Sequence, residues 1–145
     1  MGDSILGRKM AGYSKTPLLK KLGIKDGDRV LVKNASAVIP EELAKVAKVS
    51  VARDLDVALL FATTMKQFNE GFAALFTAVK PDGMIWVAWP KKSSGVPTDL
   101  SDNAIRDAAL KTPVVDVKVC AIYEIWSGLK LVVRKELRAS FRSAR

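Results

Sequence analysis

The sequence lacks histidine and has only one cysteine among its 145 residues. Without histidine, a Ser-His-Asp hydrolase and any other mechanism that uses a histidine base are excluded. A single cysteine also excludes a disulfide scaffold and a Cys/His zinc site within the chain. We therefore assign neither a catalytic residue nor a metal ligand from these residue types.

Glycine is missing over a long internal stretch, because none lies between Gly27 and Gly71. The loop after the first predicted strand falls in this stretch. A G-x-G-x-x-G fingerprint or a P-loop needs glycines there, so that backbone amides can approach phosphates closely. Both motifs are excluded, no G-x-S-x-G elbow is present, and the cofactor, if any, stays unknown.

Long hydrophobic runs are also absent. The longest, Val57 to Ala62, is far shorter than the roughly 20 residues of a membrane helix. The N-terminus has no continuous apolar region of the secretory kind. The lone Cys120 lies in a strand-like stretch, where a small core side chain is the simplest interpretation. These features favour a cytoplasmic protein with no membrane partner.

Positive charge is present in excess, with 24 Lys and Arg against 15 Asp and Glu and a net charge of +9. Residues 1–25 and residues 130–145 each hold six basic residues and one acidic residue, a net +5 apiece. The two ends are solvated tails or, alternatively, a nucleic-acid contact. We divide the chain into an arm at 1–12, one α/β domain at 13–136 and a basic tail at 137–145.

Apolar runs alternate with helical patterns along the domain. Thr64 and Gln67 form a T-x-x-Q capping box ahead of an apolar stripe from Phe68 to Val79. The alternation predicts an α/β, Rossmann-like three-layer sandwich, mostly parallel, with an antiparallel C-terminal hairpin. Strands are expected at 29–33, 57–62, 84–89, 114–123 and 129–134, helices at 16–23, 40–48, 64–79 and 101–110, and turns at 80–83 and 126–128.

Ligands of open α/β sheets bind beyond the carboxyl ends of the strands. Asn34 follows the first strand, and a loop with two lysines and two serines follows the third. This loop, with the helix start near Thr98 and Asp99, could hold an anion, although a solvated loop has the same composition. The candidate ligand-binding residues are Lys91, Lys92, Ser93, Ser94, Asn34, Thr98 and Asp99.

Three other polar or aromatic positions have competing interpretations. Asp99 is a helix cap or, in an enzyme, an acid acting with a lysine of the same loop. Asp54 is a weak candidate for a ribose contact. Trp126, with Ser127 beside it in the predicted turn, is either an exposed surface for a partner or a cover over a sheet edge.

Several short motifs together resemble a bacterial family of unknown function, domain-of-unknown-function family three thousand and fifty-two. The resemblance spans about residues 11–136 and implies kinship without a known activity. Its motifs are AGYS at 11–14, KKLGI at 20–24, WPKK at 89–92, TDL at 98–100, VKVCA at 117–121 and WSGLK at 126–130.

The order of elements also resembles the later half of class I methyltransferases. A proline–glycine turn like the one at Lys80–Gly83 precedes their fifth strand. Their glycine-rich loop binds S-adenosylmethionine, whereas residues 34–37 here read Asn-Ala-Ser-Ala. The resemblance implies the fold, and at the cofactor loop the chain departs from it.

Three functional hypotheses follow. The main one is a non-enzymatic binding or interaction protein with an anionic small ligand at the strand ends. The alternatives are an enzyme acting on an anionic small molecule, of a degenerate methyltransferase-like type, and nucleic-acid binding through the basic termini. The exposed hairpin also leaves a homodimer open.

Overall fold

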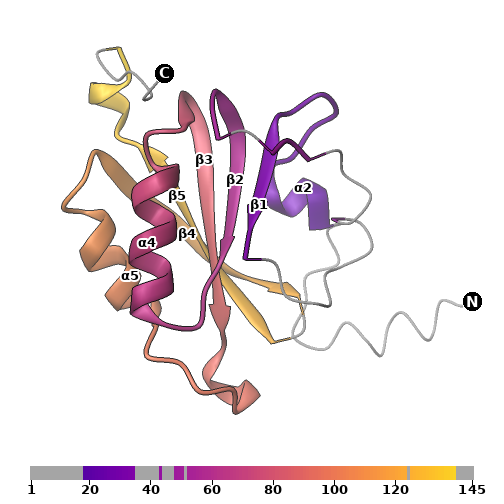
Figure 1. The fold of residues 1–145 in the computed structure, drawn as a ribbon, viewed down its shortest axis with the longest axis vertical. Helices are drawn as coiled ribbons and strands as arrows, with labels where there is room; N and C mark the ends of the chain where they lie inside the picture. Colours follow the sequence, from indigo (N-terminus) through magenta and orange to yellow (C-terminus); the bar gives the residue numbers. More distant parts are fainter. Residues whose placement is uncertain (1–17, 35–42, 44–47, 51, 124, 140–145) are drawn as a thin grey trace, which may run out of the picture.

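A computed structural model describes residues 18–34, 43, 48–50, 52–123 and 125–139. In this part of the chain, five strands form one sheet with the order β1-β2-β3-β5-β4 (Figure 1). Only β5 runs against the other four strands, because it pairs antiparallel with both β3 and β4. The predicted α/β class, with a mostly parallel sheet and a C-terminal hairpin, is confirmed. The strands are β1 (Val30–Lys33), β2 (Leu55–Phe61), β3 (Val79–Pro90), β4 (Val114–Tyr123) and β5 (Trp126–Val133).

The centre of the sheet is formed by β2 and β3, whose apolar runs are buried on both faces. They pair in parallel, with Val57 opposite Met84 and Phe61 opposite Ala88. A strand covered on both faces needs an apolar side chain at nearly every position, which explains why neither run alternates with polar residues. Both predicted strands, at 57–62 and 84–89, end within one residue of the observed ends, but β3 begins five residues earlier than predicted.

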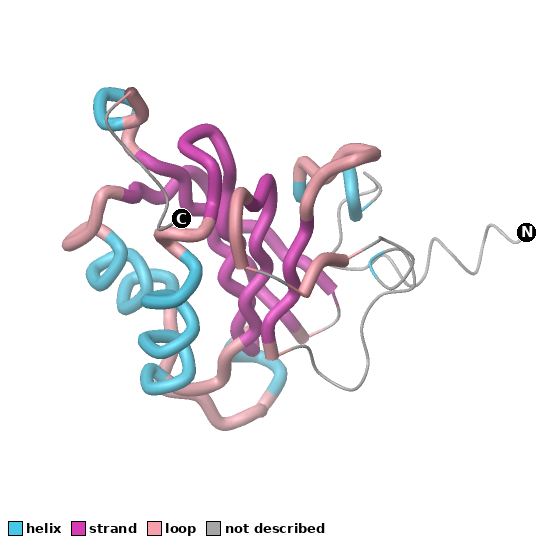
Figure 2. The backbone as a smooth tube through the Cα atoms, turned by 45° about the horizontal axis from the view of Figure 1, so that its top comes forward, coloured by secondary structure: helices cyan, strands magenta, loops and turns pink. Residues whose placement is uncertain are grey.

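Helices cover both faces of the sheet, as a three-layer arrangement requires (Figure 2). On one face, α4 (Met65–Leu75) and α5 (Asp102–Ala109) pack over the larger apolar core. On the other face, α2 (Leu18–Leu22) packs over a second core that includes Trp86 and Trp126. Gly23 ends α2 with a φ of +81°, a conformation that glycine adopts without strain.

The apolar stripe predicted for a helix at 64–79 extends beyond the end of α4 at Leu75. Phe68, Phe72 and Leu75 are buried on α4, but Val79 begins β3 and lies opposite Leu55 of β2. Helical spacing at the end of the stripe coincides with the start of the next strand, so periodicity alone could not separate the two elements. The helix predicted at 40–48 lies outside the described residues except for Leu43, which is buried, and Lys48, which forms a β-bridge with Val30.

The two predicted turns are both parts of strands. Lys80–Gly83 belongs to β3. Leu55 is aligned with Val79 and Val57 with Met84, so β3 has three more residues than β2 between these two pairs, and they form a bulge. Trp126 to Gly128 belong to β5. Gly128 is required there because a Cβ would collide with the Ile122 side chain and lie 3.2 Å from the Trp86 ring.

Candidate functional site

The carboxyl ends of β2 and β3 lie side by side, and the segments that follow them are joined by hydrogen bonds. The Thr98 hydroxyl donates to the Thr63 carbonyl at 2.6 Å and accepts from the Leu100 N–H at 3.0 Å. The Asp99 carboxylate accepts from the Met65 N–H at 2.8 Å. The loop after β3 is therefore held against the start of α4.

Both helices at this edge begin with a side-chain cap. Thr64 Oγ1 accepts from the Gln67 N–H at 3.0 Å, which confirms the capping box. The Gln67 side chain returns to the N–H and hydroxyl of Thr63, one residue earlier than the motif predicts. Ser101 caps α5 by accepting from the Ala104 N–H at 3.1 Å. Asp99 therefore caps α4, whose first residue lies 34 positions earlier in the chain. The helix that follows Asp99, α5, is capped by Ser101 instead.

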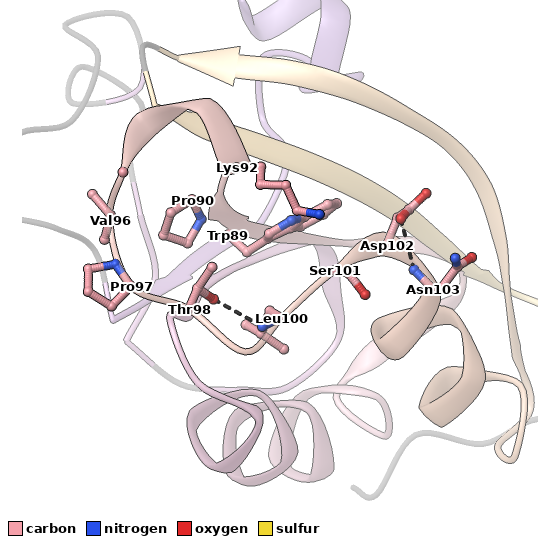
Figure 3. A pocket seen from close by; sticks show the side chains of 11 residues that line it. Trp89, Pro90, Lys92, Val96, Pro97, Thr98, Leu100, Ser101, Asp102 and Asn103 are labelled. Atoms are coloured by element: carbon pink, nitrogen blue, oxygen red, sulfur yellow. Dashed lines mark hydrogen bonds between the residues drawn. The ribbon is translucent and has the colours of Figure 1, made fainter.

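A cavity of about 690 Å³ opens between the loop after β3 and the start of α5 (Figure 3). Figure 3 shows Val96 and Pro97 on one side of it and Asp102 and Asn103 on the other. The lining combines apolar rings and side chains with a few polar groups, as small-molecule sites do. The lining residues are Trp89, Pro90, Lys92, Gly95, Val96, Pro97, Thr98, Leu100, Ser101, Asp102 and Asn103.

Lys92 is the cationic residue of this lining. Its side chain is exposed, and its ammonium group has neither an ion pair nor a hydrogen bond to any described residue. Asp102 gives the lining an opposite charge and lies 3.7 Å from Arg106. Asn103 accepts from the same arginine at 2.8 Å. The cavity thus has one unpaired cation and one carboxylate that already has a cationic neighbour.

The other residues predicted in the loop do not line the cavity. Lys91 donates its N–H to the Ile125 carbonyl at 2.7 Å and so continues the contact between β3 and the hairpin. Ser94 Oγ accepts from the Val96 N–H at 3.1 Å, and Ser93 is exposed. Of the four residues Lys91, Lys92, Ser93 and Ser94, the structure brings only Lys92 into the cavity.

Two positions near other strand ends have different surroundings. Asn34 follows β1, is exposed and has a φ of +59°, the left-handed conformation that asparagine tolerates better than most residues. Asp54 precedes the first residue of β2, so it lies at the amino edge of the sheet. A ribose contact at the carboxyl edge is therefore wrong for Asp54.

Trp126 is a strand residue with its side chain only 8% exposed, in edge-on contact with Phe61 at 4.9 Å between ring centroids. It covers the core on the α2 side, so a freely exposed stacking surface does not describe it. Ser127 lies between Trp89 of β3 and Ala121 of β4. Ser127 is thus inside the sheet beside a cavity residue.

Sequence reasoning missed the α5 side of the cavity, namely Ser101, Asp102 and Asn103. The start of this helix was predicted, but helix capping explained its polar residues without a cavity. The one available signal is the sequence distance. These residues follow the end of β3 at Pro90 by 11 to 13 positions, a distance that the connecting loop can span. No candidate metal cluster occurs among the described residues.

One carboxylate with a lowered pKa lies at the opposite edge of the sheet from the cavity. Asp56, near the amino end of β2, accepts from the Arg29 N–H at 2.8 Å and from Lys80 Nζ at 2.9 Å. Burial alone would raise the pKa of Asp56, but these hydrogen bonds and the lysine charge outweigh it and lower the pKa. Asp56 in turn raises the pKa of Lys80. This pair holds the amino edge and has no role in the cavity.

The described residues include no helix long and apolar enough to cross a membrane. No protein-family model and no curated protein matches the chain, so the kinship with a bacterial family of unknown function stays a prediction.

Solved structures with a similar backbone include a methylase and two proteins in complex with SAH or SAM. One is a complex of DhpI with SAH, with a TM-score of 0.48 and 14% identity, covering 77% of this chain and 68% of that one. Another is ribosomal protein L11 methylase from Lactobacillus delbrueckii subsp. bulgaricus, with a TM-score of 0.46 and 15% identity, covering 91% and 66%. A third is LepI with SAM, with a TM-score of 0.45 and 12% identity, covering 81% and 39%. The chain thus spans 39% to 68% of the length of these three structures.

Proposed function

We propose that this chain is a methyltransferase-like α/β domain that binds an anionic small molecule at the carboxyl edge of its sheet. The observation that carries the proposal is the cavity beside Lys92, whose ammonium group has no partner among the described residues. The apolar lining from Trp89, Val96 and Pro97 suits the non-polar part of such a ligand. The ligand's anionic group would meet the lysine.

Native mass spectrometry of gently purified protein is the first test. We expect a stoichiometric added mass on the protein as purified. In a second condition, with millimolar inorganic phosphate added, we expect a 1:1 phosphate adduct. Lys92→Ala should lose the adduct, because no lysine or arginine then remains among the lining residues. Lys111→Ala is the matched control, since it removes one exposed lysine beyond the other end of α5.

A clean apo mass in both conditions would overturn the proposal. Adducts of equal intensity in wild type, Lys92→Ala and Lys111→Ala would also overturn it, because the ion would then bind without the cavity lysine. The melting temperature of each variant shows that the comparison is made between folded proteins.

A second candidate is the enzyme form of this proposal, a methyltransferase acting on the anionic ligand. The order of elements favours it, since β1, β2, α4, β3, α5 and the β4–β5 hairpin follow one another as in the later half of class I methyltransferases. SAM and SAH are bound by two of the proteins of similar backbone. A domain of this type would use S-adenosylmethionine as methyl donor.

The loop after β1 does not fit that cofactor. It reads Asn-Ala-Ser-Ala at 34–37, and a side chain at each position keeps the backbone amides from the close approach that glycines allow. Asn34, the one described residue of these four, has a left-handed backbone conformation, which a glycine adopts without strain. We therefore derive no methyl-transfer step. Titration with S-adenosylhomocysteine tests the point: saturable 1:1 binding would support the enzyme, and no binding at 1 mM would reject it without affecting the Lys92 test.

A further inference from the structure

Two lysines lie directly opposite each other on adjacent strands. Lys118 of β4 is aligned with Lys130 of β5, which is in turn aligned with Trp86 of β3. Residues opposite each other in an antiparallel pair share one face, with Cβ atoms about 4.5–5.5 Å apart. Because Trp86 belongs to the core beneath α2, both ammonium groups extend from the α2 side of the sheet.

A third lysine reaches the same strand from α2. Lys21 Nζ donates to the Ala121 carbonyl at 2.9 Å, which fixes its ammonium group beside β4. Cys120 lies between: burial raises the pKa of its thiol, while the charges of Lys21 and Lys118 act in the opposite direction. Lys118 and Ala121 are three residues apart, about 10 Å along a strand. Lys21, Lys118 and Lys130 therefore form one basic row, which we call the lysine row.

None of the three lysines of the row forms an ion pair with a described residue. The ion pairs in this part of the chain join Lys80 to Asp56 and Arg106 to Asp102 and Asp116. Asp116 is aligned with Leu131, which packs in the core beneath α4 and α5, so its carboxylate lies on the other face of β4. Like charges directly opposite each other on a sheet are destabilising. The folded domain thus retains an unfavourable pair that an external anion would relieve.

We propose that the lysine row binds the phosphodiester backbone of a nucleic acid without reading its sequence. Two neighbouring cations with a third about 10 Å farther along β4 suit the repeated phosphates of a strand, which recur about every 3.4 Å along the axis of a DNA helix. A single phosphate would engage only one end of the row. This surface is on the folded domain and is separate from the Lys92 cavity. Two of its lysines, Lys21 and Lys130, belong to the basic end segments 1–25 and 130–145.

Fluorescence anisotropy with a labelled 20-nucleotide single-stranded DNA tests the proposal on the full chain. Lys118→Ala/Lys130→Ala should weaken binding about tenfold at 50 mM salt. It should also reduce the slope of log affinity against log salt by about 1.4, at about 0.7 for each lost phosphate contact. The double variant should melt at or above the wild-type temperature, because the opposed charges are gone.

The matched control is Lys66→Ala/Lys111→Ala, which removes the same charge from two exposed lysines on α4 and after α5. It should bind DNA as the wild type does. Equal weakening in both double variants would overturn the proposal, since net charge alone would explain it. Tighter binding to anionic lipid vesicles than to DNA would overturn it in favour of a membrane surface.

Cys120 locates the bound strand independently, because it is the only cysteine in the chain. Saturating DNA should slow alkylation of this half-buried thiol by neutral iodoacetamide, and the Lys118→Ala/Lys130→Ala variant should lose that protection. DNA that binds without changing the rate of alkylation would lie elsewhere and would overturn the assignment to this face.

Discussion

Asp56 has two donors at the amino edge of the sheet, the Arg29 N–H and the Lys80 ammonium. The Asp56 side chain is 26% exposed and the Lys80 side chain 40%. Solvent therefore screens the ion pair, and most of the stabilisation comes from the backbone hydrogen bond. The pair joins β1, β2 and the start of β3 at one point.

Asp56→Ala should lower the free energy of unfolding by about 1–2 kcal/mol at pH 7. Because folding lowers the pKa of Asp56, its contribution is present above the ordinary value of 3.8 and is lost as pH falls through the folded pKa. The difference from wild type should therefore shrink below pH 4 in urea titrations. Asp26→Ala, in an exposed turn, should change stability little; a difference that grows in acid would contradict this account.

The hydrogen-bond partners of Thr98 and Asp99 could not be assigned from the sequence. Both were predicted near a helix start, which is correct, but Asp99 caps α4 through Met65, 34 residues earlier. Local spacing predicts caps only within one turn of a helix. The capping box from Thr64 to Gln67 spans only four residues and is therefore visible in the sequence.

At the scale of elements, the bulge in β3 explains why a turn-like sequence lies within a strand. Lys80 to Gly83 has the composition of a turn, yet strand pairing with β2 resumes at Met84. Gly83 is buried, and a Cβ there would lie 2.8 Å from the Leu55 carbonyl oxygen and 3.2 Å from that of Asp56. These are backbone atoms of the neighbouring strand and cannot rotate away.

Gly83→Ala should destabilise the domain by about 2 kcal/mol or more, because β2 and β3 must separate locally. Asp82→Ala, at the exposed position beside it, should be nearly neutral. Thermal unfolding of both variants by circular dichroism makes the comparison. Equal melting temperatures for Gly83→Ala and wild type would mean that the bulge yields without cost.

The hairpin is the second element whose composition misled prediction. Trp126, Ser127 and Gly128 have the composition of a turn, but all three lie in β5. Because Gly128 has no Cβ, β5 can pass close to the side chains of Ile122 and Trp86. β4 is one edge strand of the sheet, and a register shift leaves Val117 as an extra residue there. Bulges of this kind interrupt the regular edge that another strand would need for pairing.

At the scale of the whole molecule, one sheet separates two apolar cores. Trp86 lies in the α2 core and Trp89, three residues later, in the core beneath α4 and α5. The Trp86 Nε1–H also donates to the Leu22 carbonyl at 2.9 Å. This buried bond fixes the last residue of α2 to the central strand, so that α2 and the sheet are coupled.

Trp86→Phe should lower the free energy of unfolding by about 3 kcal/mol, from the unpaired Leu22 carbonyl and the lost ring volume. Trp89→Phe should cost less, because no hydrogen bond from its indole occurs among the described residues. We expect fluorescence and far-ultraviolet circular dichroism to report one shared transition for each variant. Separate transitions would show that α2 and its core unfold independently.

The sequence by itself determined the α/β class, the strands β2 and β3, the capping box of α4, and the absence of glycine-rich phosphate loops. Each of these depends on local spacing or on residues that are simply missing. Burial on both faces requires continuous apolar runs, and those runs are readable without coordinates.

Only the tertiary structure decided which polar residues meet. Lys92 lines the cavity while Lys91 does not, Asp99 caps a distant helix, and Trp126 is buried against Phe61. The alignment of Lys118 with Lys130 likewise depends on strand register and on a bulge. A shift of one residue moves a side chain to the other face of a sheet, so contacts between distant segments cannot be read from local pattern.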